Sequence, residues 1–330
     1  MISLFSLLLI INLSFFLFFE NFSRVIGLYD SPDSVRKFHN GKVANIGGFL
    51  FFINLSAVIL YLNFFNEVGL NPFSDTSQLN LFYFFSLIFF IIGYCDDKFN
   101  INPNVKLILF IILIFFILFF FPDWIIKSLN FSFYENSFNI SKISYFFTIL
   151  AFLLFINAFN MFDGINLQSV SYSILILIIF FIKSNFNLFY LCLVIPLLIL
   201  FYLNYKNKCF LGDNGTLLIS FIFSFLFIHF HNNIKSLFAD EIFLIMLIPG
   251  LDMLRLFILR IVKGRNPFHP DRNHIHHLLV KKFGNKFSLA ILFALIFLPI
   301  IIVQFYSISI FLIILSIFFY FYLIAILTKK

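Results

Sequence analysis

The stretch VKLILFIILIFFILFFF, residues 105–121, carries no charged side chain after Lys106 and no glycine or proline. About 20 apolar residues in a helix cross the roughly 30 Å of hydrocarbon in a bilayer. Over the whole chain, 62% of the residues are hydrophobic and 11% are charged, whereas a typical soluble domain is about 25% charged. The composition therefore excludes a soluble protein and predicts one that lies largely within a lipid bilayer.

Reading outward from this stretch with the same criterion predicts an all-α, polytopic membrane protein with about eleven spans. The first expected span lacks a basic flank and a small-residue cleavage site, so we expect it to be retained and not removed as a signal peptide. No internal repeat and no Gly/Ser-rich linker divides the chain, which predicts a single domain over residues 1–330. The expected spans are 2–19, 46–65, 79–95, 105–121, 144–160, 168–183, 187–204, 214–231, 240–260, 287–305 and 308–327.

The Lys and Arg residues are divided unequally between the two sides of this layout. Cytoplasmic loops of membrane proteins carry an excess of Lys and Arg, and 18 of the 22 in this chain fall on one side. With eleven spans, this predicts an N-terminus outside and a C-terminus in the cytoplasm. The net charge of +7 then reflects orientation, and we expect no nucleic-acid partner. The four on the other side are Lys127, Lys142, Lys183 and Lys235.

Asp96 and Asp97 stand side by side at the cytoplasmic end of the third expected span, nine residues before Lys106. A carboxylate deep in a membrane costs about 2.5–3.5 kcal/mol on insertion scales, and two adjacent ones oppose each other's ionisation. The pair therefore indicates a bound cation, a proton-transfer role or a solvated helix cap. The expected catalytic loops on the cytoplasmic side are approximately 24–48, 93–106, 157–168, 206–216 and 252–286.

Asn157, Asn160, Asp163 and Asn166 recur at every third position in the loop after the fifth expected span. This spacing puts oxygen ligands on neighbouring faces of a helix end. Hard oxygen ligands suit Mg²⁺, which typically takes one or two protein ligands together with substrate phosphates. The alternative is an ordinary Asn/Gly helix C-cap, which explains Asn160 or Gly164 but not the whole run.

The segment Phe210-Leu211-Gly212-Asp213-Asn214-Gly215-Thr216 leads into the eighth expected span. Its glycines allow a close approach of backbone, and a helix start offers amides and a positive dipole end to an anion. The alternative is that Asp213 is only the N-cap of this helix. The earlier segment Asp30 to Gly48, which contains His39, is a weaker signal on the same side.

The loop RIVKGRNPFHPDRNHIHH, residues 260–277, is rich in Arg, Lys and His. A histidine-rich tract can bind zinc, but no cysteine or spare carboxylate nearby in the sequence completes a tetrahedral set. Clustered cations better suit a phosphate-bearing substrate. Attraction to anionic lipid headgroups is the alternative interpretation.

Taken in order, these segments resemble the polyprenyl-phosphate N-acetylhexosamine-1-phosphate transferase family, a group of glycosyltransferase 4 membrane enzymes. The resemblance extends from about residue 24 to residue 285. Its most specific parts are the Asp-Asp pair with Lys106, Asn-x-x-Asn-x-x-Asp-Gly, Phe-x-Gly-Asp, and Pro-Phe-x-Pro-Asp-Arg-x-His-Ile-His-His. The last of these looks like the bacterial branch that transfers GlcNAc 1-phosphate to undecaprenyl phosphate at the start of O-antigen or related cell-envelope polysaccharides.

The resemblance implies an enzyme of the bacterial inner membrane that takes a UDP-N-acetylhexosamine and a polyprenyl phosphate, releases UMP and uses Mg²⁺ or Mn²⁺. It also allows a homodimer. In the matching positions, Asn160 and Asp213 hold the metal, Phe210 stacks on uracil and Asn166 reads the edge of the base. The catalytic positions are Asp96, Asp97, Asp163 and Lys106. The remaining substrate-binding positions are His39, Asn157, Arg272, His274, His276 and His277.

Two other functions remain open at this stage. The first is phospho-MurNAc-pentapeptide transfer in peptidoglycan synthesis, although that branch carries a differently flanked three-His run. The second is a multi-span transporter, which needs ionisable or helix-breaking residues near the middle of the membrane. His229 and Pro196 are the main candidates for such residues, and each stands alone. The loss of the family's usual second glycine after Asn166 leaves the identity of the sugar open.

The orientation can be tested by cysteine labelling in intact cells. A single cysteine at Asn136, in an expected outer loop, should react with a membrane-impermeant maleimide. A single cysteine at Asn273, in the expected cytoplasmic loop, should react only after the membrane is permeabilised. The reverse pattern would overturn the predicted orientation.

Overall fold

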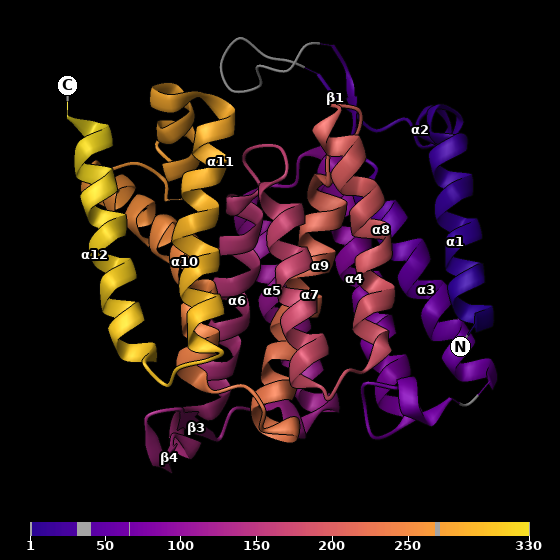
Figure 1. The fold of residues 1–330 in the computed structure, drawn as a ribbon, viewed down its shortest axis with the longest axis horizontal. Helices are drawn as coiled ribbons and strands as arrows, with labels where there is room; N and C mark the ends of the chain where they lie inside the picture. The colour runs from indigo at the N-terminus through magenta and orange to yellow at the C-terminus, as the bar shows by residue number, and fades with distance from the viewer. Residues whose placement is uncertain (1, 32–40, 66, 268–270, 330) are drawn as a thin grey trace. The chain divides into compact units, whose positions relative to one another are not determined.

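The computed structural model describes residues 2–31, 41–65, 67–267 and 271–329. Helices dominate this part of the chain, and two short antiparallel hairpins complete it (Figure 1). The helices are α1 (Ile2–Leu17), α2 (Phe19–Ile26), α3 (Gly47–Phe65), α4 (Thr76–Phe99), α5 (Pro103–Phe120), α6 (Ser144–Phe162), α7 (Gln168–Lys183), α8 (Leu188–Tyr205), α9 (Gly212–His229), α10 (Ala239–Val262), α11 (Ile275–Val303) and α12 (Ser309–Thr328). The strands are β1 (Tyr29–Asp30), β2 (Val43–Ala44), β3 (Ser128–Phe131) and β4 (Tyr134–Asn139).

The prediction of an all-α, polytopic membrane protein is confirmed. In the described residues, nine helices are long and apolar enough to cross a bilayer, namely α3 to α6 and α8 to α12. The bent pair of α1 and α2 brings the number to ten if it forms one span, and the apolar helix α7 is shorter. Each of the eleven expected spans coincides with one of these helices. The count of eleven and the orientation stay predictions.

Two expected spans differ in shape or in length from the helices that the structure shows. The first helix does not run straight to residue 19, because α1 and α2 meet at an angle of 77°. Helix α11 begins at Ile275, well before the expected start at residue 287, and it is kinked at Gly284. Gly284 has φ of 74°, a conformation that glycine adopts without a steric penalty. The histidine tract therefore lies at the start of a helix and not in an irregular loop.

The described chain divides into two compact units. The first unit contains residues 1–101 and 166–223, and the second contains residues 102–165 and 224–330. The boundary at residue 223 falls inside α9, so both units include part of this helix. The single domain expected from the sequence stays a prediction.

In the first unit, α3 packs against α1, α4 and α8, and α7 packs against α8. At one end, β1 pairs with β2, and Ala44 of β2 also bridges to Cys209 after α8. At the other end, the Asn187 side chain donates a hydrogen bond to the Asn71 carbonyl at 3.5 Å. Aromatic rings fill the interior, as in the stacked pair of Phe89 and Phe221 with centroids 4.5 Å apart.

In the second unit, α10 packs against α6, α11 and α12, and α5 packs against α6. The β3–β4 hairpin lies at the opposite end of this unit from the start of α11 (Figure 1). Its turn is fixed because Asp240 accepts hydrogen bonds from the backbone and hydroxyl of Ser132 at 2.8 and 2.5 Å. The segment expected only to connect two spans therefore has a defined structure.

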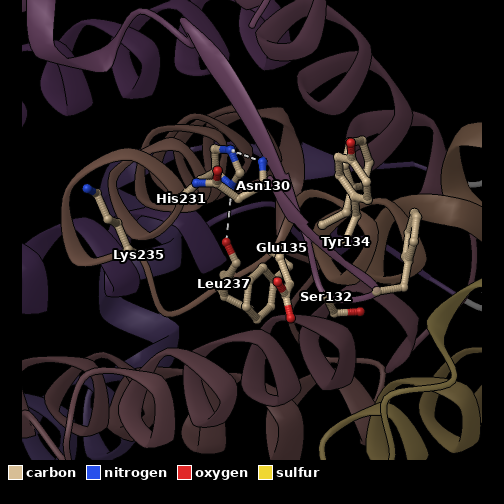
Figure 2. A pocket seen from close by; sticks show the side chains of 10 residues that line it. Asn130, Ser132, Tyr134, Glu135, His231, Lys235 and Leu237 are labelled. Carbon is tan, nitrogen blue, oxygen red and sulfur yellow. Dashed lines mark hydrogen bonds between the residues drawn. The ribbon is translucent and has the colours of Figure 1, made fainter. Parts of the chain in front are cut away.

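A cavity of about 600 Å³ lies beside this hairpin, lined by residues 130–135 with His231, Lys235, Leu237 and Phe238 (Figure 2). His231 is held there by its ring nitrogens, which lie 3.1 Å from the carbonyl oxygens of Leu237 and Ser128. The residues that line this cavity include none of the predicted site residues, so we do not assign the reaction to it.

Two buried asparagines hold helices of the first unit together. The Asn12 amide on α1 donates to Asn54 Oδ1 on α3 at 2.6 Å, and each side chain also donates to the carbonyl four residues earlier. Polar side chains within a membrane are satisfied only by such internal partners. The pair therefore fixes how α1 lies against α3.

A double-mutant cycle tests this pair. Asn54→Leu should lower the free energy of unfolding by about 1 kcal/mol, since it leaves Asn12 without its partner on α3. The double variant Asn12→Leu/Asn54→Leu should be less destabilised than the sum of the two single variants. Thermal denaturation in detergent measures both, and purely additive losses would contradict the assignment.

Candidate active site

Asp96 closes the end of α4. Its Oδ1 accepts a hydrogen bond from the Ile101 amide at 2.9 Å, and its carbonyl accepts one from the Asn100 amide at 2.8 Å. Asn100 adopts the left-handed conformation with φ of 51°, as is common after a helix end. The buried Asp96 carboxylate therefore has at least one structural role, which is the helix-cap alternative left open by the sequence.

Asp97 binds the start of α9. Its Oδ1 accepts the Asp213 amide at 3.0 Å, and its Oδ2 accepts the Asn214 amide at 2.9 Å together with the Asn214 side chain. A carboxylate at this position satisfies amides that have no partner within the helix and complements the helix dipole. The predicted anion site at this helix start thus holds an anion supplied by the protein itself. Asp97 accepts hydrogen bonds from both of these amides.

Small residues permit this close packing in the first unit. A Cβ atom on Gly93 of α4 would stand 2.3 Å from the Asp213 carbonyl oxygen. A Cβ atom on Gly48 of α3 would stand 2.1 Å from Asn214 Oδ1. The glycines therefore let α3 and α4 approach the start of α9, which is what brings Asp97 within reach of Asp213.

Asn204 connects two of the predicted nucleotide-binding positions. Its Oδ1 accepts the Leu167 amide at 2.5 Å, its Nδ2 donates to the Cys209 carbonyl at 2.9 Å, and its own carbonyl accepts from Asn166 at 3.1 Å. It therefore joins the loop of Asn166 to the segment that leads to Phe210. Phe210 is half-buried, and its amide donates to the Ala44 carbonyl at 2.9 Å.

The asparagine run of the second unit lies mostly inside α6. Asn157 and Asn160 belong to the helix, and Asp163 follows its last residue, Phe162. Asn157 donates to the Leu153 carbonyl at 2.7 Å. These three polar side chains are half-buried, as is Lys106 in the first turn of α5.

The histidines and the end of α6 come together within the second unit. A Cβ atom on Gly164 would stand 1.9 Å from Nε2 of His276, so only a glycine leaves room for the imidazole. His276 is 1% exposed. Its ring stacks on that of His274 at 5.3 Å and meets that of His277 edge-on at 4.3 Å. Two motifs that are far apart in the sequence are thus in contact.

A buried carboxylate on α10, which sequence analysis missed, organises this cluster. Asp252 Oδ2 lies 2.7 Å from His274 Nδ1, and its Oδ1 accepts hydrogen bonds from Arg255, Tyr320 and the Ile275 amide at 2.8, 2.9 and 3.1 Å. The signal was present in the sequence, because an ionisable residue inside an apolar span is itself an indication of function.

Asp252, His274 and His276 also form a group of possible metal ligands. One ligand atom from each lies within 4.8 Å of the others, and all three side chains are buried. The fold thus supplies the carboxylate that the sequence did not place near the histidines. A metal ion would share this carboxylate with the Arg255 guanidinium, which disfavours a divalent cation. The geometry is that of a carboxylate–histidine–arginine network.

A second ion pair, between Arg260 and Asp271, lies shortly before the histidines in the sequence. Arg260 Nε donates to Asp271 at 2.8 Å, and Arg260 Nη1 donates to the Pro267 carbonyl at 2.6 Å. Burial raises the pKa of Asp271, but hydrogen bonds from Arg260 and from the Asn273 amide outweigh it, so the pKa lies below its ordinary value. The ion pair between Arg260 and Asp271 is therefore kept at neutral pH. Arg272 follows and is half-buried, whereas His39 lies outside the described residues.

The predicted site residues thus form two groups, one in each unit. The structure joins Asp97 to Asp213 in the first unit and His276 to Gly164 in the second. The first group contains Asp96, Asp97, Asn166, Phe210 and Asp213, and the second contains Lys106, Asn157, Asn160, Asp163, Arg272, His274, His276 and His277.

The chain is similar to a family of known enzymes. The family model described as Glycosyl transferase family 4 matches residues 79–231. The undecaprenyl-phosphate alpha-N-acetylglucosaminyl 1-phosphate transferase of Salmonella typhi is 30% identical over 269 residues, which cover 78% of this chain and 70% of the relative. The protein of the same name from Escherichia coli (strain K12) is 27% identical over 81% of this chain and 73% of its own length. A probable undecaprenyl-phosphate N-acetylglucosaminyl 1-phosphate transferase of Bacillus subtilis is 25% identical over the same shares.

The contact between Gly164 and His276 predicts a large effect from one methyl group. Gly164→Ala should destabilise the protein by about 1–3 kcal/mol, because the imidazole or the end of α6 must move. Gly250→Ala on α10 is the matched control, since its Cβ would meet no atom within 4 Å. Thermal denaturation of both variants in detergent measures the difference, and equal melting temperatures would show that this contact is absent.

Proposed function

Because the chain belongs to glycosyl transferase family 4, we propose that it transfers GlcNAc 1-phosphate from UDP-GlcNAc to undecaprenyl phosphate and releases UMP. The names of its curated relatives support the sugar and the lipid. The observation that carries the proposal is the contact of His276 with Gly164, since it joins two of the motifs that mark this family. As a multi-pass protein with bacterial relatives of this kind, the chain belongs to the inner membrane.

The reaction brings together two polyanions, a lipid phosphate and the pyrophosphate of a nucleotide sugar. Catalysis of phosphoryl transfer consists mainly of positioning and of charge neutralisation. Arg272 and Lys106 supply hydrogen-bond donors for phosphate oxygens in the second unit. The ion pair of Arg260 with Asp271 supports this role, because it holds the residue immediately before Arg272.

The donor chemistry of the first unit fits Mg²⁺. Asp97 and Asp213 are neighbours, and a pair of close carboxylates favours a cation. We propose Asp213 as a ligand of this ion in the first unit. When bound, Mg²⁺ or Mn²⁺ neutralises charge on the pyrophosphate. Because Asp97 binds the amides of Asp213 and Asn214, its role in this proposal is to position Asp213.

The remaining roles concern the nucleotide and the sugar. In this proposal, Phe210 stacks on uracil and Asn166 reads its edge. Asn204 supports both roles, because it accepts a hydrogen bond from Asn166 and donates one to the carbonyl of Cys209, the residue before Phe210. The histidines meet the sugar, and sites built on hydrogen bonds reject analogues that lack the bonded group more strongly than apolar pockets do. We therefore expect an N-acetylated sugar.

His229, a candidate for a transport path, is instead held by Trp124, whose ring nitrogen lies 3.4 Å from His229 Nδ1.

A reconstituted assay tests the proposed function. Purified full-length protein is supplied with undecaprenyl phosphate and one of UDP-GlcNAc, UDP-GalNAc, UDP-glucose or UDP-MurNAc-pentapeptide, and UMP and the lipid product are measured. UDP-GlcNAc should be used, and UDP-glucose and UDP-MurNAc-pentapeptide should be refused. EDTA should stop the reaction, and added Mg²⁺ should restore it.

Matched variants separate the site from the fold in the same assay. Asp213→Asn should abolish turnover, whereas Asp123→Asn, which alters an exposed carboxylate in an expected outer loop, should retain it. Full turnover in EDTA would contradict the metal requirement. A failure to form any lipid-linked sugar with the whole panel would contradict the proposed function itself.

A further inference from the structure

Asp252 is a buried charge whose presence needs an explanation. It is 4% exposed and lies in an apolar helix. Replacing a buried ion pair by apolar side chains of similar size is often neutral or stabilising, so such a pair is weak evidence for a purely structural role. We therefore look for the function of Asp252 and Arg255 in the residues that they hold in place.

The two oxygens of Asp252 have different partners. Oδ1 accepts from Arg255, from Tyr320 and from the backbone, which fixes the plane of the carboxylate. Oδ2 faces His274 Nδ1 at 2.7 Å. Because an ionised carboxylate only accepts hydrogen bonds, the proton of His274 must be on Nδ1. The network thus sets both the orientation of His274 and its tautomer, and the other ring nitrogen, Nε2, is the one that remains for the reaction.

The same network fixes the backbone on both sides of His274. Arg255 donates to the Asn273 carbonyl at 2.5 Å, and the Ile275 amide donates to Asp252 at 3.1 Å. His276 follows and stacks on His274. The position of the whole histidine tract therefore depends on Asp252 and Arg255.

Tyr320 connects this network to the last helix. Its hydroxyl donates to Asp252 Oδ1 at 2.9 Å and accepts from Arg255 Nε at 2.8 Å, so it bridges the two charges. Tyr320 is 0% exposed and belongs to α12. The motifs that mark the family end near residue 285, so nothing in them assigns a role to this helix.

We propose that Asp252, Arg255 and Tyr320 form a clamp that positions His274 for the transfer reaction, and that α12 is in this way part of the catalytic apparatus. The inference rests on the proposed function. Tyr320 is a positioning residue, since it acts through Asp252 and His274. Its loss lowers kcat more than it raises KM for the nucleotide sugar, because the nucleotide is bound elsewhere.

Conservative variants of the full-length enzyme test the clamp. Tyr320→Phe removes only the bridging hydroxyl, and Tyr322→Phe on the same helix is the matched control at a side chain that is 54% exposed. Tyr320→Phe should lower kcat about three- to tenfold, the equivalent of one hydrogen bond. Asp252→Asn should lower kcat about 10- to 100-fold, as losses of supporting residues do elsewhere. Tyr322→Phe should match the wild type.

Two further readouts distinguish positioning from stability and from the proposed function. Melting temperatures in detergent should change little in Tyr320→Phe, and a kcat loss that merely follows a large fall in melting temperature would contradict the clamp. Nitrogen-15 NMR of labelled histidine, assigned with His274→Gln, should show the Nδ1–H tautomer in the wild type and a mixture in Asp252→Asn. This spectrum needs no substrate.

The outcomes therefore distinguish a failure of the proposed function from a failure of the clamp. If the wild type forms no lipid-linked sugar but the tautomer responds as expected, the proposed function is wrong and the clamp on His274 stands as a structural feature. If the wild type is active and both Tyr320→Phe and Asp252→Asn keep its kcat and its tautomer, the clamp is wrong and the proposed function stands.

Discussion

The carboxylate of Asp97, held by the first amides of α9, is the interaction on which the first unit depends. Polar groups in or near a bilayer must find their partners inside the protein. The first amides of α9 have no acceptor within the helix, and the Asp97 carboxylate only accepts hydrogen bonds. Each group therefore supplies the partner that the other needs. Asp252 does the same in the second unit, where Arg255, Tyr320, His274 and a backbone amide surround it. In each unit, one carboxylate fixes a polar segment between apolar helices; Asp97 is half-buried and Asp252 is buried.

This arrangement explains why residues suited to chemistry are also residues that hold the fold. Asp97 accepts a hydrogen bond from the Asp213 amide, and Asp252 is hydrogen-bonded to the His274 ring. Glycines at 93 and 164 complete the two groups, because a methyl group at either position would collide with the segment being held. A reaction between two polyanions requires charged side chains that do not move when the substrates arrive. The hydrogen bonds that satisfy Asp97 and Asp252 near the bilayer also keep Asp213 and His274 in place.

The fold class was predictable from the sequence because apolar length decides it, as residues 105–121 show. The positions of the site motifs were predictable from their resemblance to a family. Asn204, Asp252 and Tyr320 were not, since their roles come from tertiary contacts with residues 37, 22 and 68 positions away, respectively. The start of α11 at Ile275 was missed because the apolar criterion ignores a helical turn rich in His, Lys and Leu. For the same reason, the carboxylate that completes the group around the histidines was sought nearby in the sequence and lies instead on α10.

Hydrogen–deuterium exchange tests most directly whether each carboxylate organises its own motif. In the wild type, the amides of Asp213, Asn214 and Ile275 should exchange slowly, since each donates a hydrogen bond to a carboxylate of the protein. Asp97→Ala should speed exchange in the peptide that covers 211–216 and leave the peptide that covers 274–278 unchanged. Asp252→Ala should do the opposite. Slow exchange of both peptides in both variants would contradict the account, because the two segments would then be held by something other than these carboxylates.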